Sequence, residues 1–404
     1  MAIVAPLPAV RYDETKVGLG DVIAPPYDVI SSAEQAALYA RSPYNVIRLI
    51  LPREAERGPA ASATLREWMS GGMLARDAEP GLYLYGQTFT LPDGKKRRRE
   101  GVICRLRLEE FASGVVRPHE RTLEGPKADR LAILRATGAH LSPILGLYAH
   151  AGESARQMLG IAPGTTPMAH VTEAGGNTHD LWRVTDAAAI ARFTAALAPE
   201  TIFIADGHHR YETALVYASE RGGDGPQAHV LAYLANVEEG MVILPTHRLV
   251  RDTLLLGPQV LDNELRRRFS IAPLRPDATR IPGAIDLVLP ERRLRLRPLP
   301  AALAYLEALP PALRSLDVAL LHEAILKPLL GLGPEDLEFT HDDAEAEDAV
   351  ECGRATAAFL LHPPSIAEVR SVCMAGELMP QKSTYFYPKL ASGLVFDLVG
   401  PPWV

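Results

Sequence analysis

A short turn between an apolar strand and a helix carries the residues best suited to chemistry in this chain. The segment reads Ile204-Ala205-Asp206-Gly207-His208-His209-Arg210-Tyr211. A helix that starts directly after the turn presents unsatisfied backbone N–H groups and the positive end of its dipole to an incoming anion. Gly207 permits close backbone approach, and Arg210 supplies a forked donor that suits phosphate. The pattern predicts a phosphate-binding turn.

The Asp206 carboxylate, considered alone, disfavours phosphate binding at this turn. As an N-cap it would occupy the N–H groups that a phosphate needs. A carboxylate about 4 Å from a phosphate charge costs roughly 4 kcal/mol at an effective dielectric of about 20, whereas the helix dipole returns only about 0.3–1 kcal/mol. We therefore expect Arg210, a histidinium or a divalent cation to compensate Asp206. Otherwise Asp206 is a base that faces a substrate hydroxyl.

The neighbouring histidines His208 and His209 also raise the question of a metal site. Adjacent helical residues point about 100° apart, so the two imidazoles do not easily share one ion. The His-Glu-x-x-His motif of zinc hydrolases is absent from the sequence. The simplest alternative is a capped helix with two surface or hydrogen-bonded histidines.

A second polar cluster spans residues 118–130, where six charged side chains flank a Gly-Pro turn. Pro126 and Asp129 are ordinary signals for a helix start. An equally weighted alternative to this helix start is that the cluster forms a substrate or phosphate site. In that case Glu120 is a candidate general base and Lys127 and Arg130 are anion contacts, with His119 beside them.

Two further polar segments follow along the chain. The loop 379–389 offers Lys382, Ser383, Thr384 and Lys389, either as an edge strand with exposed polar residues or as a wall of an anion pocket. The segment 245–248 contains two more polar candidates, His247 and Arg248. Neither the Ser-x-x-Lys nor the Gly-x-Ser-x-Gly nucleophile motif is present, and the Walker and Gly-x-Gly-x-x-Gly nucleotide motifs are also absent.

Composition narrows the class of protein. The chain has 404 residues, a formal net charge of -7, 47% hydrophobic and 23% charged residues, which indicates an ordinary globular protein of two or three domains. The acidic balance disfavours a nucleic-acid partner. Three cysteines far apart favour a reducing compartment, and no run approaches the ~18 apolar residues that span a bilayer. We expect a cytoplasmic protein without a membrane partner.

The order of the expected elements indicates a mixed α/β (α+β) fold with a mixed sheet core and covering helices, because strand-like and helix-like segments alternate. The runs 82–90 and 101–106 around Asp93-Gly94 predict a hairpin, with the basic run 95–99 as its solvated tip or as a polyanion contact. The run 44–51 reads as a strand, and Ser31 or Ser32 is expected to cap a helix. We expect three segments, 1–150, 151–255 and 256–404.

Several separated motifs resemble the bacterial and archaeal domain-of-unknown-function 1015 family over nearly the whole chain. The matching segments are 24–30, 42–46, 119–130, 205–211, 244–248 and 379–389. The likeness adds Tyr27 and Asp28, together with His247 and Arg248, to the candidate substrate contacts. The family name itself implies almost no chemistry.

The segment 206–210 also resembles the phosphate-binding loop of the ParB and sulfiredoxin superfamily, which includes free-serine kinases. His208 stands where sulfiredoxins carry their reactive cysteine, so sulfinate reduction is excluded. The resemblance implies phosphate contacts from Gly207, His208, His209 and Arg210, with Asp206 near the transferred group or a magnesium ion. It implies a ParB/sulfiredoxin-like element in the segment 151–255.

These observations give three hypotheses. The first is a small-molecule kinase that uses a nucleotide or pyrophosphate as donor, with Arg210 and Lys382 or Lys389 on phosphate oxygens, magnesium as the bridging ion, and Glu120 or Asp206 as base. Free serine is the best single acceptor, by superfamily analogy. The second is a ParB-like nucleotide switch without turnover, and the third is a metal-dependent hydrolase that uses the histidines. Expected partners are a small-molecule substrate and a phosphate-containing ligand; self-association into a homo-oligomer stays open.

Overall fold

The computed structural model describes the chain except residues 92, 123, 174, 252–257, 276–277 and 401–404. The chain divides into two compact units. Unit 1 comprises Met1–Pro118, Thr122–Met241 and Pro388–Val404, and unit 2 comprises His119–Arg121 and Val242–Tyr387. The expected segment boundary near residue 150 falls inside unit 1, and the boundary near residue 255 lies outside the described residues. The division into three segments therefore stays a prediction.

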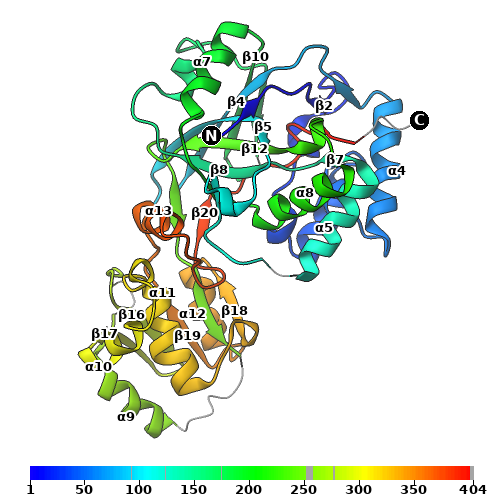
Figure 1. Cartoon of the computed structure of the whole chain (residues 1–404). Helices are drawn as coiled ribbons and strands as arrows, with labels where there is room; N and C mark the ends of the chain where they lie inside the picture. Colours follow the sequence, from blue (N-terminus) through cyan, green and yellow to red (C-terminus); the bar gives the residue numbers. More distant parts are fainter. Residues whose placement is uncertain (92, 123, 174, 252–257, 276–277, 401–404) are drawn as a thin grey trace. The chain divides into compact units, whose positions relative to one another are not determined.

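A large mixed sheet forms the centre of unit 1 (Figure 1). Among the described residues it has nine strands in the order β6-β11-β8-β12-β5-β4-β10-β9, with β1 paired to β5. The strands are β1 (Val4–Ala5), β4 (Leu82–Thr90), β5 (Lys96–Arg107), β6 (Val116–Arg117), β8 (Ile144–Tyr148), β9 (Ala169–Thr172), β10 (Thr178–Val184), β11 (Ile202–Asp206) and β12 (His229–Asn236). Parallel and antiparallel pairs occur together, which confirms the expected mixed α/β class.

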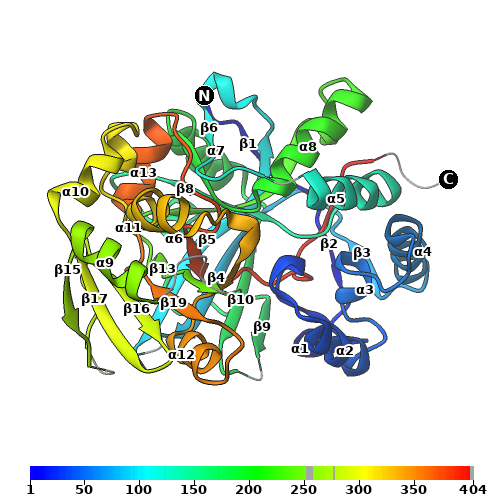
Figure 2. The ribbon, with the colours of Figure 1, turned by 90° about the horizontal axis from the view of Figure 1, so that it is seen from below.

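Helices and two small sheets complete unit 1, and α5 lies beside α4 and α8 in both views (Figures 1 and 2). The helical elements are α1 (Leu19–Val22), η1 (Tyr27–Val29), α2 (Ser32–Arg41), α3 (Ile47–Ile50), α4 (Arg57–Ser70), η2 (Phe111–Ser113), α5 (Glu124–Thr137), α6 (Ala155–Met158), α7 (Ala187–Leu197), α8 (His208–Arg221) and η3 (Pro226–Ala228). The small sheets pair β2 (Val10–Tyr12) with β3 (Leu74–Arg76) and β7 (Ala139–His140) with β21 (Asp397–Leu398).

Local sequence signals account for several of these elements. Ser31 accepts a hydrogen bond from the Glu34 backbone N–H, and the Glu34 carboxylate accepts one from the Ser31 N–H, so the expected capped helix is confirmed as α2. The expected hairpin is confirmed as β4 and β5, which pair in antiparallel register. The basic run is exposed from Lys95 to Arg98, but Arg99 is buried; the expectation of a wholly solvated tip was wrong at Arg99.

The strand expected over residues 44–51 was wrong, because the chain forms the short helix α3 there. Asn45 explains the difference. Its side-chain oxygen accepts the Ile47 N–H at 3.0 Å, and its amide donates to the backbone oxygens of Asp21 and Ile23. Because the apolar residues of α3 are buried on more than one side, their spacing did not distinguish a helix from a strand.

Unit 2 is built on a second sheet in the order β15-β17-β16-β19-β14-β18, with a separate pair β13-β20. These strands are β13 (Val242–Leu244), β14 (His247–Val250), β15 (Phe269–Pro273), β16 (Ile285–Leu289), β17 (Arg292–Pro298), β18 (Leu337–Thr340), β19 (Ala357–Leu360) and β20 (Tyr385–Tyr387). Its helical elements are α9 (Pro258–Arg268), α10 (Pro300–Leu303), η4 (Ala304–Leu306), η5 (Pro311–Leu313), α11 (Asp317–Leu321), the π-helix η6 (His322–Leu330), η7 (Pro334–Asp336), α12 (Asp343–Glu351) and α13 (Ile366–Met374).

Within the described part of the chain, no helix is both long and apolar enough to cross a membrane.

The last part of unit 1, from residue 388 onward, returns to the large sheet and carries Lys389. Arg105 on β5 binds the Asp397 carboxylate with two parallel hydrogen bonds, Nε to Oδ2 at 2.8 Å and Nη2 to Oδ1 at 2.6 Å. The Asp397 side chain is 1% exposed. A bidentate ion pair that is buried in this way fixes the returning segment to the sheet.

Replacement of Asp397 tests this anchor. We expect Asp397→Ala to lower the free energy of unfolding by about 3–5 kcal/mol, because it leaves the Arg105 guanidinium buried without its partner. Chemical denaturation of the full chain measures the change. Glu220→Ala is the matched control, since it removes the exposed Arg135–Glu220 pair, and it should have a much smaller effect. Equal effects of the two substitutions would contradict the anchoring role.

Candidate functional site

The turn that follows β11 is shaped by a bulge and a left-handed glycine. The register of β11 against β8 shifts between Ile204 and Asp206, and such a shift redirects the side chain that follows. Gly207 has φ +89°, which side chains with a Cβ rarely adopt. A Cβ at this position would also stand 3.0 Å from the Arg210 guanidinium carbon. The backbone conformation therefore favours glycine at this position, and the close approach of Arg210 adds to that preference.

Helix α8 starts at His208 with Gly207 as its N-cap residue, and no side chain caps it. The expectation that Asp206 caps this helix was wrong. Asp206 is the last residue of β11, and both of its carboxylate oxygens are engaged by cationic side chains. The N-cap position of α8 is therefore taken by Gly207 and not by Asp206.

Asp206, Arg210 and Lys389 form a compact ionic cluster, which we call the Asp206 cluster. Arg210 Nη2 donates to Asp206 Oδ2 at 2.5 Å, and Lys389 Nζ donates to Asp206 Oδ1. The three side chains are only 12–13% exposed. Two cations against one carboxylate leave a net formal charge of +1 at the N-terminal end of α8. The compensating charge that the sequence required is supplied by Arg210 together with Lys389.

The protonation state of Asp206 follows from its surroundings. Burial opposes ionisation, but the Lys389 ammonium, the Arg210 guanidinium and His208 hold the pKa of the Asp206 carboxyl well below its usual range. Asp206 is therefore a carboxylate at neutral pH and a weak base. This state favours a role as organiser of the two cations over a role as proton acceptor.

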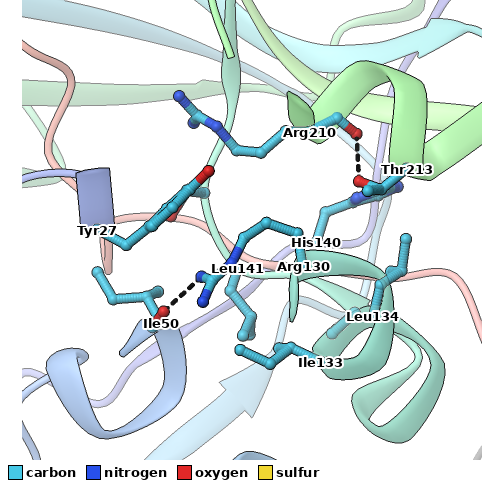
Figure 3. A pocket seen from close by; sticks show the side chains of 11 residues that line it. Tyr27, Ile50, Arg130, Ile133, Leu134, His140, Leu141, Arg210 and Thr213 are labelled. Carbon is cyan, nitrogen blue, oxygen red and sulfur yellow. Dashed lines mark hydrogen bonds between the residues drawn. The ribbon is translucent and has the colours of Figure 1, made fainter. Parts of the chain in front are cut away.

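A small pocket of about 50 Å³ lies on the Arg210 side of the turn (Figure 3). It brings together Tyr27 from η1, Arg130 from α5 and Arg210 from α8, with Ser142 and Thr213 also lining it. The guanidinium carbon of Arg130 lies 3.9 Å from the centre of the Tyr27 ring. The volume suits roughly three to five water molecules or one small polar group.

The Tyr27 hydroxyl is a donor in this pocket at neutral pH. Burial, with Asp28 as a further cause, raises the pKa of Tyr27 to about 12, and Arg130 and Arg210 counteract only part of the rise. Figure 3 shows the Tyr27 ring extending toward Arg210. Arg130 itself donates to the Ile50 carbonyl and to the Asp129 carboxylate. The pocket wall therefore offers hydrogen-bond donors of both neutral and cationic type.

Two further predicted residues of unit 1 have different positions. Lys127 Nζ lies 3.1 Å from the Glu212 carboxylate of α8, which also accepts a hydrogen bond from Thr122. Asp28 is exposed and does not line the pocket. The structure thus gathers Tyr27 and Arg130 close to the Asp206 cluster through Arg210, whereas Asp28 points to solvent.

The remaining predicted residues belong to unit 2, where they form a second polar cluster around the loop 379–387. The His119 ring nitrogen Nε2 lies 2.8 Å from the Thr384 hydroxyl, and the Glu120 carboxylate accepts the Lys382 backbone N–H at 3.1 Å. The Ser383 hydroxyl donates to the Pro380 carbonyl. Sequence segments more than 250 residues apart therefore meet in one place.

Arg248 holds the same loop from inside unit 2. It is fully buried and donates to the carbonyls of Gln381 and Lys382 at 3.2 and 3.1 Å. Burial lowers the pKa of Arg248 to about 9, against the opposing effect of Glu120. Among the described non-glycine residues, Lys382 alone has a positive φ, +56°, and such strained conformations concentrate at functional sites.

His247, in contrast, has the contacts of a structural histidine. Its Nε2 lies 2.7 Å from the Asp343 carboxylate, and its Nδ1 accepts the Leu361 backbone N–H at 3.2 Å. Both ring nitrogens are occupied within unit 2. Burial lowers the pKa of His247, with Asp343 opposing the shift.

Two residues that hold Lys389 in place were missed by the sequence analysis. Arg99 and Gln87 lie opposite each other on β5 and β4, and both donate to the backbone around Lys389. Arg99 was grouped with its exposed basic neighbours. Strand alternation places Arg99 on the face of Ile103, opposite Val102 and Cys104, and because β5 is buried on both faces the apolar pattern alone did not distinguish Arg99 from its exposed neighbours.

The expected magnesium site has no preformed set of ligands among the described residues. Within the described ranges, no group of three or more His, Cys, Asp or Glu side chains is arranged to hold a metal ion. Asp206, the expected ligand, has both oxygens engaged by Lys389 and Arg210. As arranged here, the Asp206 carboxylate is held by the two cations and is not placed as a magnesium ligand.

The fold therefore defines a mixed α/β protein in which a strand of the large sheet leads through a cationic turn into a helix. A family model described as "Protein of unknown function (DUF1015)" matches residues 4–319, and the chain belongs to this family. The comparison with curated proteins gives no match.

Several solved structures are similar to this chain. One is a conserved hypothetical protein from Pyrococcus furiosus, with 13% identity and a TM-score of 0.36, covering 70% of this chain and 92% of that chain. A free serine kinase in complex with AMP has 14% identity and a TM-score of 0.36, covering 69% and 89%. SbnI with C-terminal truncation from Staphylococcus aureus has 12% identity and a TM-score of 0.36, covering 70% and 84%.

The lowered pKa of Asp206 gives a pH-dependent prediction. Because the folded pKa lies below the unfolded value of roughly 3.9, ionised Asp206 stabilises the fold above about pH 4, and this stabilisation is lost as the pH falls toward the folded pKa. Asp206→Asn should therefore be less stable than the native chain by roughly 3–5 kcal/mol at pH 7. The difference should shrink below about pH 4. Denaturation series from pH 7 to about pH 2.5 measure it, and a difference that stays constant below pH 4 would contradict the assignment.

Proposed function

We propose that the protein is a phosphotransferase that holds the phosphate groups of a nucleotide or pyrophosphate at the turn between β11 and α8. The observation that carries the proposal is the Asp206 cluster at the start of a 14-residue helix. The helix end supplies backbone N–H donors, and the cluster supplies a net positive charge. Both features favour a phosphate group over a neutral ligand.

Charge balance supports this choice. A unit charge about 4 Å from a phosphate charge contributes roughly 4 kcal/mol at an effective dielectric of about 20. The repulsion from Asp206 is therefore offset by one of its two cationic partners. The second cation leaves a net attraction of similar size, to which the helix dipole adds about 0.3–1 kcal/mol.

Each residue of the turn then has a distinct part. Arg210 and Lys389 share their donors between Asp206 and the phosphate oxygens, as charge-assisted hydrogen bonds. Gly207 lets the ligand approach the backbone, and the N–H groups of His208 and His209 lie in the first turn of the helix. The pocket with Tyr27 and Arg130 accepts a small polar part of the acceptor.

The transfer step follows from the chemistry of phosphoryl groups. The oxygen of an acceptor hydroxyl bonds to phosphorus while the bond from phosphorus to the donor's bridging oxygen breaks. The hydroxyl proton passes to a carboxylate base, and the donor leaves one phosphoryl group shorter. Free serine is the acceptor that we test first, on the superfamily likeness of the turn.

The assay that tests the proposal uses the purified full chain with ATP, ADP or pyrophosphate as donor, magnesium in the buffer, and a panel of amino acids and polyols as acceptors. Phosphorus NMR identifies a phosphorylated product. Absence of product with every donor and acceptor would count against transfer.

The same Asp206 cluster also supports a second function, a nucleotide-dependent switch without turnover. The observation that favours it is the weak basicity of Asp206, because both carboxylate oxygens are held by cations. Calorimetry separates the two functions. Nucleotide binding with a change of oligomeric state and no product supports the switch.

Arg210 provides the direct test of the phosphate contact. We expect Arg210→Ala to weaken pyrophosphate binding by about 1.5–3 kcal/mol, the worth of a charged hydrogen bond, which is roughly 10- to 150-fold in Kd. Isothermal titration calorimetry measures the change. Arg221→Ala removes an exposed arginine at the other end of the same helix and should leave the affinity unchanged. An unaltered Kd for Arg210→Ala would remove the turn from the site.

Glu120 is the candidate base from unit 2, and kinetics test its part. If it accepts the acceptor's proton, Glu120→Gln should lower kcat by about 100-fold or more and change the affinity for pyrophosphate little, because general-base catalysis contributes roughly 10²–10⁴-fold. A steady-state assay with the acceptor found above gives both quantities. Equal losses in kcat and in affinity indicate a role in holding the loop 379–387 instead.

A further inference from the structure

Lys389 reaches Asp206 from a segment whose backbone is held by two side chains of the large sheet. The Gln87 amide on β4 donates to the Lys389 carbonyl at 3.1 Å. Arg99 on β5 donates through Nη2 to the carbonyl of the preceding residue, Pro388, at 2.8 Å. Two consecutive carbonyls are therefore fixed, and the Lys389 side chain starts from a defined point.

Gln87 and Arg99 also hold each other. They are direct cross-strand partners in the β4–β5 register, and Arg99 Nη2 donates to Gln87 Oε1. Because the Gln87 oxygen accepts from a guanidinium, its NH₂ group is the end that faces the Lys389 carbonyl. The orientation of the amide is thus determined by Arg99.

Burial of the charged Arg99 guanidinium costs free energy of folding. Arg99 is 0% exposed, and its Nε and Nη1 have no hydrogen-bond partner among the described residues. Arg99 donates to the neutral oxygens of Gln87 and Pro388, and its guanidinium carbon lies 5.6 Å from the centre of the Tyr233 ring. A buried charge without a carboxylate costs several kcal/mol, so Arg99 is not explained by stability.

We infer that Arg99 and Gln87 are positioning residues, which fix the backbone of Pro388 and Lys389 so that the Lys389 ammonium meets Asp206. The inference rests on the proposed function in one respect, that the charge of the Asp206 cluster serves to bind an anion. Without the Gln87 amide, the Lys389 carbonyl is released and the ammonium leaves the carboxylate. The cluster then falls from a net charge of +1 to neutral, and its attraction for phosphate declines.

A double-mutant cycle on the full chain tests this coupling, with pyrophosphate as the probe and calorimetry as the measurement. We expect Lys389→Gln to weaken binding about 10- to 100-fold, as the loss of one charged hydrogen bond does, and Gln87→Leu to weaken it by at least about 5-fold. If Gln87 acts through Lys389, adding Gln87→Leu to the Lys389→Gln chain should change Kd by less than about 2-fold. A full additional loss in the double variant would overturn the inference.

A second readout does not depend on pyrophosphate. Loss of Lys389 from Asp206 should raise the pKa of the Asp206 carboxyl, which carbon NMR of labelled aspartate follows. Gln87→Leu and Lys389→Gln should raise it by similar amounts, whereas a purely structural Gln87 leaves it unchanged. If pyrophosphate fails to bind the native chain but the pKa shifts occur, the proposed function fails and the positioning role stands.

Two matched variants distinguish a loss of positioning from a general loss of folding. Gln87→Glu keeps the shape and the acceptor for Arg99, and it pairs the buried charge, but it faces the Lys389 carbonyl with an oxygen. We expect it to fold and still to lose affinity by at least about 5-fold. Tyr83→Phe removes a buried hydroxyl bound to Asp77 on the same face of β4, about 13 Å along the strand, and should leave Kd unchanged. Native affinity in Gln87→Glu, or a loss in Tyr83→Phe equal to that in Gln87→Leu, contradicts the inference.

Discussion

One buried carboxylate held between two cations is the interaction on which the rest of the candidate site depends. Asp206 keeps Arg210 and Lys389 together at the N-terminal end of α8, and their excess charge makes the turn attractive to an anion. Without Asp206 the two cations would repel each other, and without either cation the carboxylate would repel a phosphate. The same contacts keep the pKa of Asp206 low, so the cluster retains its charge across the neutral pH range.

The geometry of the turn satisfies this electrostatic requirement through the backbone. The register of β11 shifts just before Asp206, and the left-handed Gly207, which is the N-cap residue of α8, leaves room for the Arg210 guanidinium. The helix N-terminus is consequently not capped by a side chain. A capping side chain adds about 0.5–2 kcal/mol of stability, and α8 does without this contribution at its N-cap residue.

Membership in the DUF1015 family supplies no chemistry, and the proposed function depends on the charged turn. The Asp206 cluster favours a phosphate-containing ligand in both proposed functions. They differ in the proton acceptor, because an ion-paired carboxylate with a low pKa is a poor base. Glu120, whose carboxylate accepts the Lys382 backbone N–H, is the other carboxylate that the sequence proposed as a base.

The sequence by itself determined what depends on neighbours along the chain: the strand–turn–helix at Gly207, the capping box at Ser31, and the β4–β5 hairpin. It did not determine what depends on distant segments. Lys389 reaches Asp206 from 183 positions away, and Arg99 is buried because the returning backbone at Pro388 covers it with acceptors. The helix at Ile47 replaced the expected strand because Asn45 bonds backbone groups more than 20 residues away. Local propensity fixes elements, whereas the charge of a site is the sum of side chains that only tertiary packing brings together.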